Sequence, residues 1–594
     1  MRTPRASHNR RAGRPAPSDF RTLAHQTPRR LLARRQYTSS IEQNATWHRR
    51  KPLTRHLQSN AVKDWLRGLG VNLLSARIRP STKSSTKSGS SASRRHSYAG
   101  APVAFLYAAK RGEPGPDIRS ADCLPLIRSA AATGDEMILT MSSINLAVLD
   151  WANAGATDRE RVMTRNGTQQ GLTRVTNLTR SIAELVESVR SDGDAALVTA
   201  LRTFDGVEAT PDSLRVREDE FAAARAELSY EVIEAIRVGI ARSQAFNEAI
   251  VQRANWSMPA AGGTVVGEVA RPIESVGLFV PSGKGSYPSV LIQIGTPAVV
   301  AGVSRIAIVV PPNPTPGRAR VDAATLVVAA ELGIDEVYCL NGPSGVAALA
   351  VGTETVLAVG KIVGPGSPAV TIAQQLVQSM GVQVAPGLGP TDSLIIADST
   401  ADPVILAADF LSEAEHGVDS SAVLVSTDRN LLEQVANEVE TQWRDLPDPR
   451  RDYAKSSISD NGGLVLAASD EQALEIANAY ASEHVQLAVA DPEAWLAGVR
   501  QAGTVLLGQW TPFSASSYSI GTPATLPTTG FAKSVSGVTA HTYLTKIATA
   551  AVSENDFWTI APAIEVLAAH EGFPAHRASV TVRRNLHGRP ASVS

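Results

Sequence analysis

The sequence predicts an α/β protein with two Rossmann-like, doubly wound domains, in which helices cover parallel sheets. Short apolar runs of strand length alternate with stretches of helical length between residues 276 and 508. Such alternation is typical of parallel sheets that are buried on both faces. The nine runs exceed the roughly five or six strands of a typical sheet, so we expect two α/β units with a boundary near residues 392–400.

The nine expected strands are rich in Val, Ile and Leu, and residues bounding them are often Gly, Pro, Ser or Asp. Residues of this kind favour a buried, pleated sheet. In chain order the strands are VGLFV (276–280), RIAIVV (305–310), EVYCL (336–340), GKIVG (360–364), SLIIAD (393–398), SAVLVS (421–426), GLVLAA (463–468), VQLAV (485–489) and GTVLLG (503–508).

Helical periodicity precedes the first of these strands. Ile182, Leu185, Val186 and Val189 lie on one face of a helix, and Gly193 interrupts the pattern before it resumes. We therefore expect a helical N-terminal arm and, beyond the last strand, a helical C-terminal segment. The expected divisions are the arm over 141–270, a first Rossmann-like domain over 271–392, a second over 393–510 and the C-terminal segment over 511–594.

Residues 1–140 are expected to form a disordered basic leader. The 594-residue chain has 57 basic and 57 acidic residues, but 26 of the basic and only 8 of the acidic residues lie in this leader. An Arg-rich, acid-poor start is typical of a mitochondrial transit peptide, and the alternatives are a basic tail or an upstream region never used as protein. We expect a mitochondrial protein if the leader is made, and a cytoplasmic one if translation starts near Met141.

The composition excludes several classes of protein. The acidic body after residue 140 excludes a nucleic-acid-binding protein that depends on a basic surface. The two cysteines, Cys123 and Cys339, cannot form a disulfide framework or a Cys-based zinc site. No uninterrupted apolar run reaches 18 residues, so no membrane span is expected.

The dinucleotide-binding fingerprint G-x-G-x-x-G follows none of the expected strands. The nearest glycine-rich turns are residues 281–285 and 364–367, and each lies between an expected strand and a helix. Backbone N–H groups and the helix dipole could hold a phosphate there. Ordinary strand-to-helix connections have the same composition, so the turns alone leave both interpretations open.

Two pairs of titratable residues in the body could support chemistry. Glu413 and His416 are three residues apart near the end of an expected helix, and on one helical face they could bind a metal together. Glu483 and His484 place an acid beside a base suited to proton transfer near neutral pH. For both pairs the alternative is a solvated pair without a chemical role.

Longer blocks of the sequence carry a family resemblance. They are RPIESVGLFVPSGKGSYPS, TPAVVAGVSRIAIVVPP, VAALAVGTETV, KIVGPGS, LIIAD, DFLSEAEHGVDS, YASEHVQL, AGTVLLGQWTPFSA and EGFPAHRASVTVR. In these blocks, from about residue 179 to residue 583, the chain resembles the histidinol dehydrogenase family. The resemblance implies a homodimeric, zinc- and NAD-dependent oxidoreductase with two Rossmann-like domains that lack the glycine fingerprint. The name-giving members oxidise L-histidinol through the aldehyde to L-histidine, a reaction of histidine biosynthesis.

The resemblance also implies roles for individual residues. Glu483 matches the carboxylate that activates water for the second oxidation, and His484 matches the base that takes protons from the reacting oxygen. Glu413 falls where the family has a glutamine zinc ligand, and His416 where it has a histidine ligand. These matches favour catalytic and metal-binding roles for the two pairs.

Two further matches lie near the C-terminus. His576 matches a histidine zinc ligand and Glu571 a substrate-binding glutamate, and the resemblance implies that both are supplied across the dimer interface. Glu413, His416 and His576 would then form a two-histidine, one-carboxylate set with an open position, which is a recognised catalytic zinc arrangement.

Other matched positions depart from the family. Ser517 stands where the family has an aspartate zinc ligand, and Ala524 where it has an active-site histidine. In the substrate strand, Thr391-Asp392 replaces Ser-Glu. In the cofactor site, the side chains that match the family's tyrosine, glutamine and asparagine are those of Phe279, Ser344 and Ser367, while the backbone at Gly364 and Gly366 remains available.

We therefore expect a zinc- and NAD-dependent oxidation of a small-molecule alcohol, either L-histidinol or another amino alcohol or diol, to the aldehyde and possibly the acid. The lost cofactor contacts leave an alternative, a catalytically impaired paralogue that keeps the fold and the dimer as a binding or scaffolding protein. A third possibility is an enzyme of the same fold with another metal or an altered cofactor.

Overall fold

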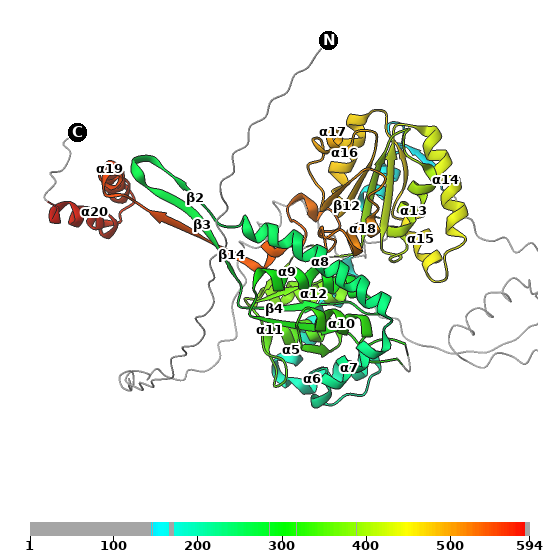
Figure 1. The fold of residues 1–594 in the computed structure, drawn as a ribbon, viewed down its shortest axis with the longest axis horizontal. Coiled ribbons are helices and arrows are strands. Elements are labelled where there is room, and N and C mark those ends of the chain that lie inside the picture. Colours follow the sequence, from blue (N-terminus) through cyan, green and yellow to red (C-terminus); the bar gives the residue numbers. More distant parts are fainter. Residues whose placement is uncertain are drawn as a thin grey trace, which may run out of the picture. The chain divides into compact units, whose positions relative to one another are not determined.

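The computed structural model describes residues 144, 146–165, 172–283, 285–315, 318–385, 387 and 389–587 (Figure 1). All of them belong to one unit, Glu136–Ser594. The expected leader over 1–140, with its targeting alternatives, lies outside the described residues, as does Met141.

The first α/β unit contains a five-stranded parallel sheet with the strand order β6-β5-β4-β7-β8. Its strands are β4 (Ser275–Phe279), β5 (Arg305–Val310), β6 (Val337–Cys339), β7 (Lys361–Val363) and β8 (Gln383–Val384). The connecting helices are α9 (Pro288–Ala301), α10 (Ala323–Glu331), α11 (Gly342–Val351) and α12 (Pro368–Gln378). Leu278 lies in a core shared with α9 and α10, and Phe279 in one shared with α11 and α12. Because neighbouring residues of a strand face opposite ways, helices cover both faces.

The second α/β unit contains a six-stranded sheet, also parallel, with the order β1-β11-β10-β9-β12-β13. Its strands are β1 (Val148–Asp150), β9 (Asp392–Ala397), β10 (Ser421–Ser426), β11 (Gly463–Leu466), β12 (His484–Ala488) and β13 (Thr504–Leu507). Its helices are α13 (Pro403–Ala414), α14 (Arg429–Trp443), α15 (Arg450–Ser459), α16 (Asp470–Tyr480), α17 (Pro492–Leu496) and α18 (Phe513–Tyr518). Leu394 packs in the core with α16 and Ile395 in the core with α13 and α14, so this sheet too is covered on both faces.

The segment before β4 is mainly helical. Its helices are α4 (Ala156–Thr164), α5 (Leu172–Asp192), α6 (Asp194–Ala200), α7 (Glu218–Glu227) and α8 (Tyr230–Gln252). The predicted interruption at Gly193 is confirmed, because α5 ends one residue before it and its φ of 56° lies in the left-handed region. Helix α5 packs on α11 and α12, and α8 packs on α9, so these helices complete the first α/β unit.

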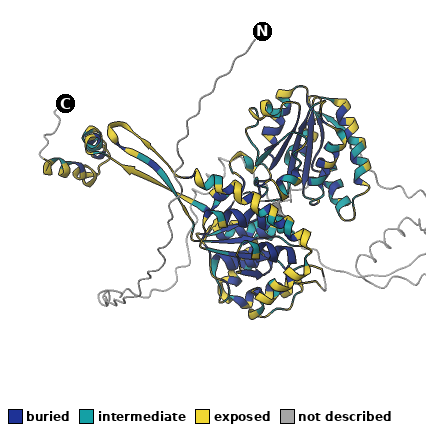
Figure 2. Cartoon of the chain, in the orientation of Figure 1, coloured by how far each residue is buried: buried dark blue, intermediate teal, exposed yellow. Residues whose placement is uncertain are grey.

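An antiparallel sheet and two helices extend from the two units. The sheet has the order β14-β3-β2, with strands β2 (Trp256–Pro259), β3 (Val265–Pro272) and β14 (Leu544–Ala551). After β14 the chain forms α19 (Glu554–His570) and α20 (Pro574–Leu586). Short helical turns complete the fold: η2 (Leu201–Asp205), η3 (Pro211–Ser213), η4 (Ala261–Gly263), η5 (Phe531–Lys533) and η6 (Ala540–Tyr543). We call β2, β3, β14, α19 and α20 the C-terminal arm; Figure 2 shows that much of it is exposed.

The mixed α/β fold with parallel, helix-covered sheets is confirmed, and each of the nine predicted strands is present to within two residues. The helical prediction over 141–270 is wrong for β1, β2 and β3, and the helical prediction over 511–594 is wrong for β14. Strand β1, with three residues, is too short to show an apolar pattern. Strand β2 and most of β14 are exposed, so their residues need not be apolar. None of the helices in the described part of the chain has the length and apolar character that a membrane span requires.

Gly364, directly after β7, permits a close approach of two strand ends. Its φ is +146°, and a Cβ there would lie 2.0 Å from the carbonyl oxygen of Phe279. We therefore expect Gly364→Ala to lower the free energy of unfolding by about 2 kcal/mol or more, measured by denaturant titration. At Gly360, just before β7, the nearest atom to an added Cβ is 3.8 Å away. The control Gly360→Ala should be nearly neutral, and equal losses in both variants would contradict this account.

Candidate active site

A cavity of about 950 Å³ collects most of the predicted site residues. The first α/β unit lines it with the turns that follow β4 and β7, at the carboxyl ends of its strands. The second unit lines it mainly with segments that precede β9, β10 and β12, at the amino ends of its strands. Ligands of parallel α/β sheets typically lie beyond carboxyl strand ends, which the cavity meets in the first unit but not in the second.

Glu413 and His416 lie at the C-terminal end of α13, where both line the cavity. Glu413 is buried, whereas the His416 side chain is 40% exposed. The His416 Nδ1 atom lies 3.1 Å from the Glu413 carbonyl oxygen and 3.8 Å from the Glu413 carboxylate. The spacing of three residues thus brings the two side chains together, as predicted.

Glu483 and His484 lie at the start of β12 and are both buried. The His484 Nε2 atom is 3.9 Å from a Glu483 carboxylate oxygen, and the ring packs edge-on against Phe513. The Nδ1 atom of His484 has no hydrogen-bond partner among the described residues. A buried histidine with an unpaired ring nitrogen at a cavity wall is suited to meet a ligand.

Burial changes the acidity of this pair in opposite directions. It raises the pKa of Glu483 well above its ordinary value, and the negative charges of Asp392 and Glu413 raise it further. It lowers the pKa of His484, and the Glu413 carboxylate opposes this effect in part. Near neutral pH the imidazole is therefore neutral and able to accept a proton.

Glu413, Glu483 and His484 each present a possible ligand atom, and these atoms all lie within 4.8 Å of one another. Two carboxylates this close and this deeply buried cannot both be ionised at low cost unless a proton or a cation lies between them. The donor set of carboxylates and imidazole is one that zinc accepts.

Ser517 and Ala524 also line the cavity, although neither supplies a carboxylate or an imidazole. Gln293 of α9 fixes the backbone on which they stand. Its Nε2 donates to the Ser516 and Ser517 carbonyl oxygens at 3.3 and 3.5 Å, and its Oε1 accepts from the Ala524 N–H at 3.2 Å. The substituted positions therefore face the cavity from a fixed loop.

Only some of the residues predicted to bind the substrate and the cofactor line the cavity. Thr391, Gly366 and Ser367 line the cavity, and Ser367 caps the N-terminus of α12. Gly364, Phe279 and Ser344 are not among the lining residues. Phe279 is buried among the helices on one face of the first sheet, and the Ser344 hydroxyl donates to the Asn341 carbonyl oxygen at 3.2 Å. Cofactor binding by these residues stays a prediction.

Glu571 and His576 lie in the C-terminal arm, at the end of α19 and in the first turns of α20. Both are exposed, and neither lines the cavity of its own chain. The His576 ring packs against Phe573 with 5.2 Å between ring centres. Within one chain these two residues are therefore separate from the other predicted site residues.

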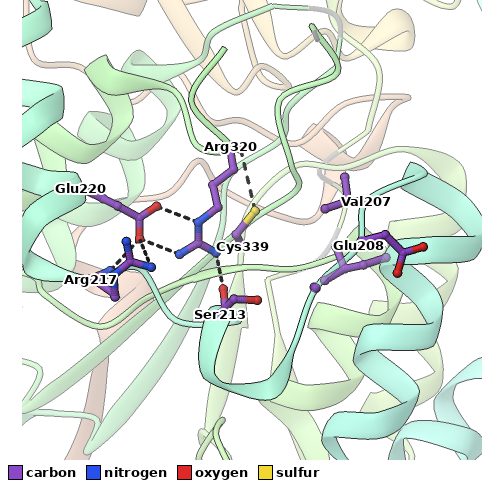
Figure 3. Close-up of a pocket in the computed structure, with 9 residues that line it drawn as sticks. Val207, Glu208, Ser213, Arg217, Glu220, Arg320 and Cys339 are labelled. Carbon is purple, nitrogen blue, oxygen red and sulfur yellow. Dashed lines mark hydrogen bonds and ion pairs between the residues drawn. The ribbon is translucent and has the colours of Figure 1, made fainter. Parts of the chain in front are cut away.

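A second cavity, of about 320 Å³, is lined by Cys339 of β6 and by the ion pair of Arg320 with Glu220 (Figure 3). Arg320 donates to both carboxylate oxygens of Glu220, each at 2.7 Å, and to the Arg215 carbonyl oxygen at 2.9 Å. Burial raises the pKa of the Cys339 thiol to about 12, which leaves it unreactive. The arrangement is that of an ion pair joining α7 to the connection between β5 and α10.

Sequence interpretation missed three side chains at the main cavity or behind it. Gln293 and Arg450 line the cavity, and Arg165 lies behind it, paired with Asp392. Gln293 lies in a predicted helix and Arg450 at the start of α15, and neither position has a local pattern that marks it. Arg165 and Asp392 are far apart in the chain, so only the folded structure brings them together.

Comparisons with known proteins agree with one another. The family model described as histidinol dehydrogenase matches residues 168–584. The chain is 36% identical over 403 residues to the histidinol dehydrogenase of Synechocystis sp., covering 68% of this chain and 92% of that protein. It is 37% identical over 442 residues to the histidinol dehydrogenase of Xanthomonas euvesicatoria, covering 74% of this chain and 100% of that protein.

Two further matches extend this comparison. A protein of Colwellia psychrerythraea described as a histidinol dehydrogenase homolog is 38% identical over 407 residues, covering 68% of this chain and 90% of its own length. The crystal structure of histidinol dehydrogenase from Elizabethkingia anophelis matches with a TM-score of 0.70 at 32% identity, covering 75% of this chain and 99% of that one. Sequence and fold thus point to the same group of proteins.

The raised pKa of Glu483 predicts how the stability of the metal-free protein depends on pH. Because the folded chain holds this proton more tightly than the unfolded chain, the free energy of unfolding falls as pH rises from 4.5, the ordinary value, toward the raised pKa. Melting temperatures measured across this range should show the decline, and Glu483→Gln should flatten it. The control is Glu433→Gln on the exposed side of α14. A decline that is unchanged in Glu483→Gln would assign it to other groups.

Proposed function

The chain belongs to the histidinol dehydrogenase family, and on this basis we propose that it is a zinc- and NAD-dependent oxidoreductase acting on an alcohol. The observation that carries the proposal is the buried Glu483–His484 pair beside Glu413 and His416 in one large cavity. The substrate class is L-histidinol or another amino alcohol or diol, and the product is the aldehyde and possibly the acid.

The residues at the cavity fit a divalent metal ion. Buried carboxylates lie close together without an intervening cation among the described side chains, and His484 has an unpaired ring nitrogen. We assign metal binding to Glu413 and His416, with His576 of a second copy, while the neutral hydroxyl of Ser517 is at best a weak ligand. Bound zinc would act as a Lewis acid that lowers the pKa of the substrate alcohol.

His484 is the proposed base. Its neutral imidazole can take the proton of the substrate hydroxyl, and NAD, when bound, would supply the hydride acceptor that oxidation of the alcohol to the aldehyde needs. Glu483 has a raised pKa, and in its ionised form it can take a proton from a water molecule that attacks the aldehyde in a second oxidation. Burial keeps the imidazole of His484 neutral, as its role requires. The raised pKa of Glu483 favours its protonated form, and a cation bound beside it would favour the ionised form that acts as a base.

The first α/β unit is the proposed NAD-binding domain, Rossmann-like but without the glycine fingerprint. The turn at Gly366 and Ser367 leads into α12 and lines the cavity. The turn after β4, around Ser282, lines it as well. The Ser367 hydroxyl accepts from the Val370 N–H, and the positive end of the α12 dipole can still favour a phosphate of the cofactor at this turn.

A homodimer would complete the site. The helices of the C-terminal arm expose large apolar side chains, among them Val566 at 68%, Leu567 at 58% and Leu586 at 79%. Large exposed apolar side chains, where they form a patch, are typical of interaction surfaces. We propose that a second copy covers the arm, and that the arm brings His576 and Glu571 to the cavity of that copy.

The second candidate function is that of a catalytically impaired paralogue that keeps the fold and dimer as a binding or scaffolding protein. The observation that favours it is that Ser517 and Ala524 present neither a carboxylate nor an imidazole to the cavity. This candidate predicts no stoichiometric zinc and no thermal shift with NAD.

Metal content separates the two candidates. We expect the full-length protein to hold about one zinc per chain, measured by plasma mass spectrometry. His416→Ala and His576→Ala should each lose the metal, whereas His484→Ala should keep it and lose turnover. The control is His570→Ala at the exposed end of α19.

The outcomes of this experiment have distinct meanings. Zinc retained in all three variants would overturn the ligand assignment. Zinc lost in His484→Ala but kept in His416→Ala would place the ion among Glu413, Glu483 and His484. A zinc-free protein even after supplementation would favour the paralogue.

The lowered pKa of His484 predicts the pH dependence of turnover. Since the neutral imidazole is the active form, kcat/KM with L-histidinol and NAD should fall on the acid side with a pKa below 6.5, the ordinary value. Removing the base in His484→Ala should lower kcat by about 100- to 10,000-fold. His541→Ala, outside the cavity, should leave the rate and the profile unchanged. An acid limb above pH 6.5 that survives in His484→Ala would assign the base to another residue.

A further inference from the structure

Asp392, the first residue of β9, holds the backbone that carries Glu483. It is fully buried, and its Oδ1 accepts from the Glu483 N–H at 2.8 Å and from the Ser482 hydroxyl at 3.1 Å. Its Oδ2 accepts from the Thr529 N–H at 2.5 Å. One carboxylate thus joins the start of β12 to the loop at Thr529. This loop directly follows residues 524–526, which line the cavity.

Arg165 supplies the opposite charge. Its Nε lies 3.0 Å from Asp392 Oδ2, and the two side chains are 6% and 1% exposed. The same guanidinium lies over the Tyr480 ring at 3.9 Å and donates to the Tyr480 carbonyl oxygen at 3.1 Å. Arg165 follows α4, so this cation comes from the connection after β1, which precedes every other strand of the two main sheets.

The backbone around this pair is strained. Arg165, Ala481 and Thr529 have φ angles of 54°, 51° and 52°, and they are the non-glycine residues with positive φ in the described part of the chain. Arg165 and Thr529 bond to Asp392, and Ala481 precedes Ser482, which does so too. Left-handed backbone costs about 1 kcal/mol or more per residue and persists only where the surrounding contacts impose it.

We propose that Arg165 is a positioning residue that, through Asp392, fixes Glu483 and His484 in the cavity wall; this rests on the proposed function of that pair. Removing the cation leaves the Asp392 charge buried without a partner, and a buried carboxylate in that situation takes up a proton or rearranges. Either change weakens the bonds to the Glu483 and Thr529 N–H groups. The catalytic pair then loses its fixed place although it contacts neither Arg165 nor α4.

The chain offers a matched control on the same helix. Arg161 of α4 donates to the carbonyl oxygens of Ser459 and Gly462, at 3.1 and 2.8 Å, and so ties α4 to the second α/β unit without contacting Asp392. Arg161→Met should therefore loosen the helix alone. Arg165→Met should loosen the helix and also release the catalytic pair. Arg165→Lys keeps the positive charge and should therefore preserve part of the fixed position of the pair.

Two measurements on the full chain test the proposal. Hydrogen exchange of the peptide covering residues 481–485 should become at least about tenfold faster in Arg165→Met and stay unchanged in Arg161→Met. With L-histidinol and NAD, Arg165→Met should lower kcat by about 10- to 100-fold with little change in KM for NAD, and Arg165→Lys should recover part of the rate.

The outcomes are separable from those of the proposed function. Equal losses of kcat in Arg161→Met and Arg165→Met, or unchanged exchange in Arg165→Met, would overturn the positioning role. If no alcohol is turned over, the proposed function fails while hydrogen exchange still decides whether Arg165 holds this segment. If Arg165→Met does not fold, the milder Arg165→Lys, compared with Arg161→Lys, gives the same comparison.

Discussion

The candidate site depends on a buried negative charge at the first residue of β9. Asp392 lies in a central strand of the six-stranded sheet, between β10 and β12, and its charge is met by Arg165 from the far N-terminal side of the chain. A buried carboxylate without a counter-charge costs several kcal/mol. The end of α4, the start of β12 and the loop at Thr529 must therefore stay together, and the cavity wall is fixed as a consequence.

The carboxylates on the cavity side of this anchor have a different environment. Asp392 has a cation in contact, whereas Glu483 is buried beside Glu413 and its pKa is raised. Structural ion pairs satisfy their charges within the protein, while groups that handle protons or ligands are left to be satisfied by what binds. Asp392, which is paired with a cation, therefore fits a structural role, whereas Glu483, which has no cation in contact, fits a role in proton transfer or ligand binding.

Much of the fold could be predicted because both main sheets are covered by helices, so their strands are continuous apolar runs. The three-residue β1 and the exposed β2 lack that pattern, and they were missed. For the site, Glu413 with His416 and Glu483 with His484 were found because each pair is local in the chain. Arg165 and Asp392 are separated in the chain by the whole first α/β unit, and no sequence pattern joins them. The proposed approach of His576 to the site would require a second copy of the chain.

The substitutions at the cavity bear on whether the chain is catalytic. Relative to the aspartate and glutamine ligands that the family resemblance implies, Ser517 removes one carboxylate near the proposed metal and Glu413 adds one. The added carboxylate lies on α13, close to Glu483. Two buried acids with ligand atoms within 4.8 Å of each other destabilise the fold unless a proton or a cation lies between them. In a scaffolding paralogue, a neutral residue in place of Glu413 or Glu483 would raise the stability of the fold without loss of function. The presence of both acids, beside a histidine with an unpaired ring nitrogen, therefore favours a site that binds a cation and transfers protons.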